Sequence, residues 1–145
     1  MAIVTLKVKR ISAASRLPSA ARPGDAGLDL FSIDTVRLEP GGSRLIRTGI
    51  AIELPEGTEA QIRPRSGLAF EHQITVLNAP GTVDQGYRGE IGVILINHGT
   101  KAFEVVAGMR IAQLVVKPVL TVTVAEVAEI TPTERGGSGF GSTGN

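Results

Sequence analysis

Residues 91–97, Ile-Gly-Val-Ile-Leu-Ile-Asn, are the stretch of this chain that decides its fold. The run is short, apolar throughout and rich in isoleucine and valine, which is typical of a strand buried on both faces. Turn-forming pairs bound it, Gln85-Gly86 on one side and His98-Gly99 on the other. Because a strand needs hydrogen-bonding neighbours, this segment predicts the interior of a β-sheet.

The rest of the chain repeats this pattern of short β-branched segments separated by turns. Helical periodicity is absent, and only Gly67–His72 has the character of a short helix. The other expected strands are residues 3–9, 28–32, 43–52, 58–63, 73–77, 102–106, 110–117 and 119–127. Short strands at regular spacing favour an all-β sandwich or barrel.

Residues 119–127, Val-Leu-Thr-Val-Thr-Val-Ala-Glu-Val, alternate apolar and polar side chains late in the chain. A β-branched strand in this position would be a bare sheet edge unless another strand pairs with it. A neighbouring subunit is one solution that would cover it.

Composition restricts the chemistry available. The 145 residues, 42% hydrophobic and 20% charged, suit one globular domain. There is no Cys, and the two His are isolated, so thiol chemistry and a His-rich metal cage are excluded. A metal, if used, would be a hard cation such as Mg²⁺ on oxygen ligands. The net charge of +1 gives no case for nucleic-acid or membrane binding, and the N-terminus lacks a signal-peptide pattern, so we expect a cytoplasmic protein.

The C-terminal residues 135–145, Arg-Gly-Gly-Ser-Gly-Phe-Gly-Ser-Thr-Gly-Asn, cannot pack a core. Residues 139–144 match G-x-G-x-x-G, but that dinucleotide fingerprint needs a strand before it and a helix after it. A flexible linker is the ordinary interpretation of such a tail. Phe140 and Arg135 favour another, because an aromatic ring and a guanidinium suit a mobile flap that closes over a phosphorylated ligand.

Five segments place polar residues inside glycine-rich turns. They are residues 23–30 (PGDAGLDL), 63–69 (RPRSGLA), 77–90 (LNAPGTVDQGYRGE), 110–114 (RIAQL) and the tail. Arginine outnumbers lysine by eleven to four, and guanidinium groups bind phosphate in a bidentate manner. Each segment alone is compatible with ordinary turn chemistry.

In this order the five segments resemble the five motifs of the homotrimeric dUTP pyrophosphatases (dUTPases), over residues 23–144. The resemblance implies a single-domain jelly-roll (β-clip) sandwich, with residues 1–130 as the domain and 131–145 as a mobile flap. It also implies a homotrimer with shared active sites. The implied reaction is Mg²⁺-dependent hydrolysis of dUTP to dUMP and pyrophosphate, which limits uracil incorporation into DNA and supplies dUMP for thymidylate synthesis.

The resemblance assigns the chemical step to a few residues. Asp84 is expected to orient and deprotonate the water that attacks the α-phosphorus, in a dry, glycine-lined hairpin. Asp29 is expected to hold Mg²⁺ through water. Ser66 stabilises the leaving group in this scheme, since no His is placed to make it a nucleophile. The phosphates are gripped by Arg65, Ser66, Gly67, Arg110 and Gln113.

The remaining assignments concern the nucleoside and the tail. Asn78 is expected to read the uracil edge. Tyr87 is expected to lie against the deoxyribose and exclude a 2′-OH, although a hairpin tyrosine can also simply cover a sheet. In the tail, Phe140 would stack on uracil, and the phosphate contacts would come from Arg135, Gly141, Ser142 and Thr143.

Two alternatives remain at this point. The dCTP deaminases share the fold but differ in the second motif and lack this tail, and ammonia release from dCTP would identify one. A dUTPase-like binding protein without turnover is the other, and intact Asp84, Arg135 and Phe140 argue against it.

Overall fold

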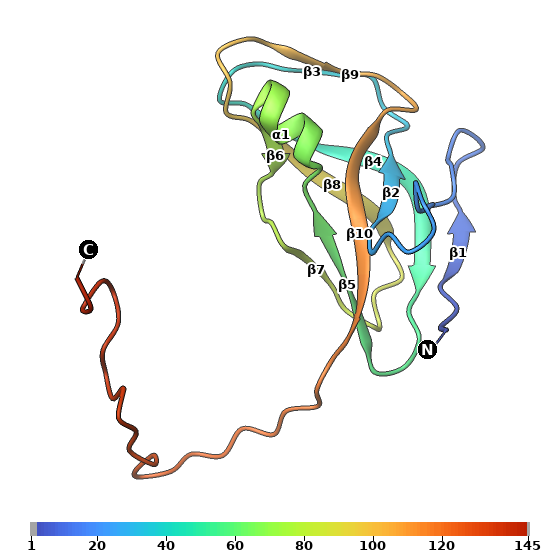
Figure 1. The fold of residues 1–145 in the computed structure, drawn as a ribbon. Coiled ribbons are helices and arrows are strands. Elements are labelled where there is room, and N and C mark those ends of the chain that lie inside the picture. Colours follow the sequence, from blue (N-terminus) through green and yellow to red (C-terminus); the bar gives the residue numbers. More distant parts are fainter. Residues whose placement is uncertain (1–2, 145) are drawn as a thin grey trace.

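A computed structural model describes residues 3–144 and contains ten strands and one helix (Figure 1). One sheet has the order β1-β4-β8-β6, with all neighbours antiparallel. Its strands are β1 (Lys7–Arg10), β4 (Ser43–Glu53), β8 (Glu90–Asn97) and β6 (Ile74–Val76).

The second sheet has the order β2-β10-β5-β7 and is also antiparallel. Its strands are β2 (Leu28–Phe31), β10 (Arg110–Pro118), β5 (Thr58–Arg63) and β7 (Gly81–Val83). A separate pair joins β3 (Val36–Leu38) and β9 (Phe103–Val105). The expected all-β jelly roll is confirmed.

One apolar core lies between the two four-stranded sheets. From the first sheet it takes Ile46, Val93 and Leu95, and from the second Leu30 and Leu114. Along β8 every second residue is buried, and β4 and β6 pair with its two edges. The segment therefore lies in the interior of a sheet, as expected, but the alternate residues on its other face are only half-buried in the single chain, so the expectation of burial on both faces was wrong.

The short helix α1 (Ser66–His72) follows β5 directly, where Gly67–His72 was expected to be helical. It ends at Gln73, which adopts the left-handed conformation with φ 55° and donates its backbone N–H to Ala69 O and Leu68 O. The turn between β5 and α1 places Arg65 and Ser66 beyond the end of β5, an interior strand of the second sheet.

Some strand predictions were wrong or incomplete. Strands β3 and β7 were not predicted, because three residues are too few to show a period. Residues 119–127 form no strand in this chain, since no neighbouring segment pairs with them beyond Val119 N–H donating to Gly57 O at 2.9 Å. Leu120, Val122 and Val124 are accordingly 86%, 75% and 91% exposed.

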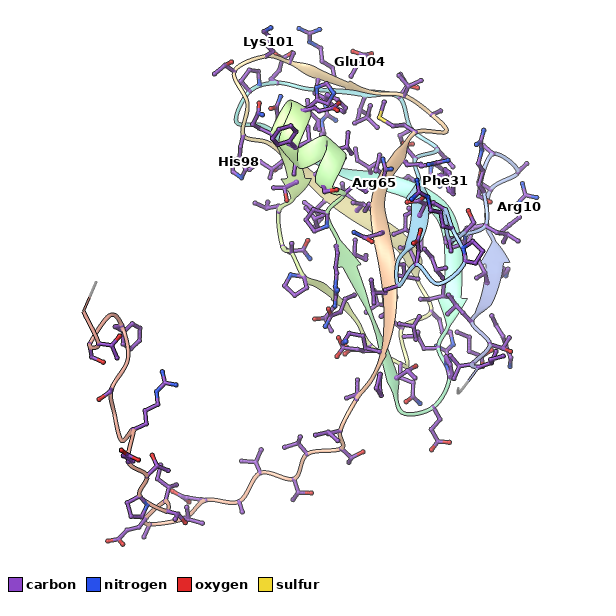
Figure 2. All side chains as sticks on the ribbon, in the orientation of Figure 1. Arg10, Phe31, Arg65, His98, Lys101 and Glu104 are labelled. Carbon is purple, nitrogen blue, oxygen red and sulfur yellow. The ribbon has the colours of Figure 1, made fainter. Side chains whose placement is uncertain are left out.

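Residues 119–144, which we call the arm, extend away from the two sheets (Figure 1), and their side chains stand apart from the body (Figure 2). The body is residues 3–118. No helix of residues 3–144 has the length and apolar content needed to cross a bilayer.

Candidate active site

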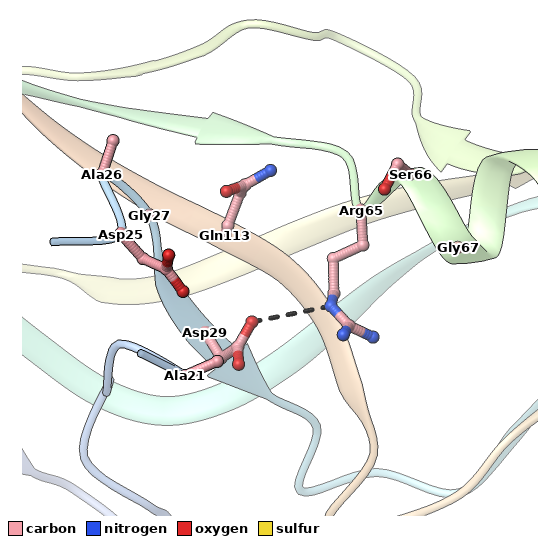
Figure 3. Close-up of a pocket in the computed structure, with 9 residues that line it drawn as sticks. All are labelled: Ala21, Asp25, Ala26, Gly27, Asp29, Arg65, Ser66, Gly67 and Gln113. Carbon is pink, nitrogen blue, oxygen red and sulfur yellow. Dashed lines mark ion pairs between the residues drawn. The ribbon is translucent and has the colours of Figure 1, made fainter. Parts of the chain in front are cut away.

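The first pocket, of about 330 Å³, lies where the loop before β2 meets β10 and the turn between β5 and α1 (Figure 3). Five predicted site residues line it: Asp29, Arg65, Ser66, Gly67 and Gln113. They come from three of the sequence motifs, so the fold brings the first, second and fourth motifs together.

Strand register explains this convergence. Gln113 on β10 lies opposite Asp29 on β2 and opposite Arg63 on β5. Directly opposed residues of antiparallel strands have their side chains on the same face. Leu114 and Ala112 point into the core, so Gln113 and Asp29 share the outer face of the sheet.

A β-bulge adds Arg110 to that face. Arg110 lies three residues before Gln113, and strict alternation would place the two side chains on opposite faces. The register shifts between Arg110 and Ala112, and Arg110 lies opposite Phe31, two residues from Asp29 on β2. The extra residue at the bulge therefore aligns Arg110 with Gln113 and Asp29.

Asp29 forms ion pairs with two arginines, Arg65 and Arg110. Its Oδ1 lies 3.5 Å from Arg65 Nε and its Oδ2 3.7 Å from Arg110 Nε. The Asp29 side chain is only 14% exposed, so water screens these pairs less than it would at an open surface. A carboxylate between two guanidiniums keeps two cations side by side, ready for a polyanionic ligand.

Two neighbouring residues, Pro64 and Gly27, determine where the Gln113 side chain lies. Its Nε2 donates to Pro64 O at 2.9 Å. A Cβ atom at Gly27 would overlap Gln113 Oε1, so glycine at this position leaves room for the Gln113 side chain in its present conformation. Gly27 and Asp25, which also line the pocket, were missed as site residues although both lie in the first motif.

A second pocket, of about 190 Å³, is lined by three further predicted residues of the body, Asn78, Asp84 and Tyr87. It lies beside β7 and the start of β8. Asn78 and Asp84 are exposed, so the dry environment expected for Asp84 is wrong for the single chain.

Hydrogen bonds within the hairpin fix the position of Tyr87. Its hydroxyl donates to Glu90 O at 2.9 Å, and its backbone N–H donates to Asp84 O at 3.0 Å. Glu90 also lines the pocket and pairs with Arg47, whose Nε lies 3.0 Å from Glu90 Oε2. The hydrogen bond from Arg47 to Glu90, together with the charge of Glu90, raises the pKa of the Arg47 guanidinium.

The predicted tail residues reach neither pocket. Phe140 is fully exposed, and Arg135 Nε donates only to Ser138 O, at 3.1 Å. Gly141, Ser142 and Thr143 belong to the same distant part of the arm (Figure 1). The structure therefore distributes the predicted site over two pockets and an arm that touches neither.

The dUTPase family model matches residues 13–144. The deoxyuridine 5'-triphosphate nucleotidohydrolase of Alkaliphilus metalliredigens is 62% identical over 96% of this chain and 96% of its own length. The enzyme of the same name from Trichodesmium erythraeum is 61% identical over 96% of this chain and 98% of its own length.

Solved structures agree. A variant dUTPase of Staphylococcus bacteriophage 80alpha, with dUpNHpp, has a TM-score of 0.91 and 31% identity over 97% of this chain and 99% of its own. A variant dUTPase from phage phi11 of S. aureus, described with a structural Mg(II) ion, has a TM-score of 0.81 and 28% identity over 87% of this chain and 98% of its own. With its five motifs, its jelly roll and these relatives, the chain belongs to the dUTPase family.

Proposed function

We propose specific roles for the residues of this dUTPase, which hydrolyses dUTP to dUMP and pyrophosphate. The observation that carries the proposal is the pairing of Arg65 and Arg110 with one carboxylate, Asp29, beside Ser66 and Gln113. Two guanidiniums and two neutral hydrogen-bonding groups around one hollow suit a triphosphate.

Arg65 of the first pocket and Arg110, which pairs with the pocket residue Asp29, bind the phosphates, and entry of the triphosphate gives them a stronger partner than Asp29. Ser66 stabilises negative charge on the leaving pyrophosphate. Gln113, fixed by Pro64, donates to a phosphate oxygen, and Gly67 allows close approach of the backbone.

Mg²⁺ is the cofactor we propose. No three His, Asp or Glu side chains gather into a metal site within residues 3–144. Mg²⁺ commonly keeps several waters and takes further ligands from substrate phosphates, so one carboxylate, Asp29, fits it through water. When bound, the ion would neutralise part of the triphosphate charge.

In the second pocket, Asp84 is the general base that orients the attacking water and takes its proton. Tyr87 lies against the deoxyribose and leaves no space for a 2′-OH. Asn78 binds the uracil edge with its paired amide donor and acceptor.

We propose a homotrimer in which one site takes parts from different chains. Supporting this are the two separate pockets of the single chain and the exposed apolar side chains at the start of the arm. Residues 131–145 act as the mobile flap. Phe140 stacks on uracil, and phosphate contacts come from Arg135, Gly141, Ser142 and Thr143.

The cellular role we propose is removal of dUTP in the cytoplasm, which limits uracil incorporation into DNA and supplies dUMP for thymidylate synthesis. The near-neutral net charge of +1 supports a protein that binds neither nucleic acid nor membrane.

Pyrophosphate release from dUTP, dCTP, dTTP and UTP, with and without Mg²⁺, tests the proposal. We expect release from dUTP, much less from the other three, and loss of activity after chelation. Comparable release from UTP would contradict the role of Tyr87, and ammonia release from dCTP would indicate a deaminase activity.

A further inference from the structure

The side chain of Arg88 folds back onto the hairpin that carries Asp84 and Tyr87. Its Nη1 donates to Gln85 O at 2.8 Å and to Tyr87 O at 3.2 Å. These carbonyls belong to the turn that is closed by the hydrogen bond from Tyr87 N–H to Asp84 O. One nitrogen of the guanidinium thus connects two carbonyls of the turn, while the second nitrogen, Nη2, remains free to face another group, a division of contacts that a single ammonium nitrogen matches less well.

Arg88 also connects the hairpin to the first sheet. Its Nη2 lies 3.8 Å from Oε1 of Glu53, the last residue of β4, and Glu53 Oε2 lies 3.2 Å from Lys7 Nζ on β1. These three residues, with Lys9, line a surface hollow of about 440 Å³. Arg88 and Glu53 are about half exposed, and exposed ion pairs contribute little to stability. The effect of this network is therefore expected in the orientation of the hairpin and not in stability.

Tyr87 depends on the hairpin for its orientation. It is 47% exposed and outside the hydrophobic core, and its ring lies over Gly89, where a Cβ atom would overlap the hydroxyl. Gln85 gives the turn a second anchor, because Gly57 N–H donates to its Oε1 at 2.9 Å. A change in the turn backbone would therefore move Tyr87 and Asp84 together.

We propose that Arg88 is a positioning residue that fixes the Asp84–Gly89 turn, and with it the contact of Tyr87 with the substrate sugar. The proposal rests on the proposed function of Tyr87. Arg88 itself touches no reacting atom, and Glu53 orients its guanidinium.

The chain offers a direct probe, since Tyr87 is its only tyrosine and it has no tryptophan. Time-resolved anisotropy of tyrosine fluorescence therefore reports on this one ring. The variants are Arg88→Ala, Arg88→Lys and, as a matched control, Arg44→Ala. Arg44 is an exposed arginine whose side chain makes no hydrogen bond or ion pair within residues 3–144.

In Arg88→Ala we expect a faster, larger-amplitude anisotropy decay. We also expect the preference in kcat/KM for dUTP over UTP to fall by roughly fivefold, as for the loss of about one net hydrogen bond. The melting temperature should stay near that of the wild type. Arg88→Lys should recover part of both effects, and Arg44→Ala should change neither.

An Arg88→Ala protein whose anisotropy decay matches that of Arg44→Ala would overturn the proposal. Tyr87→Ala distinguishes this failure from a failure of the proposed function. If Tyr87→Ala leaves UTP as poor a substrate as before, the sugar contact is wrong, and the anisotropy still decides whether Arg88 positions the ring.

Discussion

Strand β8 and residues 119–127 are both rich in β-branched residues, but β8 is a paired, buried strand and residues 119–127 are unpaired and exposed. In β8, Ile91, Val93 and Leu95 are at most 1% exposed, and strands pair with both of its edges. In the arm, Val122 and Val124 are 75% and 91% exposed, and no strand pairs with them. The difference lies in the available neighbours, because β-propensity reflects packing and pairing more than the backbone itself.

The comparison indicates that the body and the arm have different roles in the protein. The body completes its core with residues 3–118, while the arm has apolar side chains that this chain does not cover. We infer that the body determines stability, that the start of the arm binds a neighbouring subunit, and that its end closes the site.

Asp84→Asn changes the body's chemistry and leaves the arm intact. We expect turnover of dUTP to fall by roughly two to four orders of magnitude, because an amide cannot accept the proton of the attacking water. Equilibrium binding of a non-hydrolysable dUTP analogue should remain near normal. Single-turnover kinetics measure the loss of turnover, and titration with the analogue measures binding. A near-normal kcat would rule out Asp84 as the base.

Truncation after Thr133 removes the end of the arm and leaves the body intact. We expect activity to fall by roughly a hundredfold or more, since the uracil and the γ-phosphate lose their contacts with the tail. Unlike Asp84→Asn, this change should weaken binding of the dUTP analogue. Melting temperature and oligomeric state should be unchanged, and a truncated protein that unfolds or works normally would contradict the division.

Leu95→Ala opens a cavity in the core of the body. Leu95 is 1% exposed, so the substitution should lower the free energy of unfolding by about 2–5 kcal/mol. Equilibrium unfolding in denaturant measures this change in the free energy of unfolding. A loss below about 1 kcal/mol would mean that β8 is not at the centre of the core.

Val124→Ala is the matched change in the arm. It should leave the unfolding of the body almost unaffected, because the side chain has no cover in its own chain. If the arm packs on a neighbour, the substitution should instead raise the dissociation constant of the oligomer. Sedimentation over a range of concentrations checks this, and an unchanged constant would remove Val124 from the interface.

The sequence predicted the parts of the molecule that depend on local pattern. The run 91–97 and the helix near Gly67 follow from local pattern and turn chemistry, while the motifs around the first pocket follow from the resemblance of the five segments, in their order, to the dUTPases. Strand 119–127 was predicted wrongly because its alternation says nothing about which chain supplies the pairing edge. The β-bulge that aligns Arg110 with Gln113, and the place of Gly27 under Gln113, depend on three-dimensional register.

The most direct test of the shared site mixes two damaged chains. Asp84→Asn and the truncation after Thr133 are unfolded together in equal amounts and refolded, with subunit mixing verified by native mass spectrometry. If Asp84 and the tail of one site come from adjacent chains of a ring, each mixed trimer contains one intact site. Random assembly makes about three-quarters of trimers mixed, so roughly a quarter of wild-type activity should return. Activity no greater than the sum of the two parent proteins would contradict the shared site.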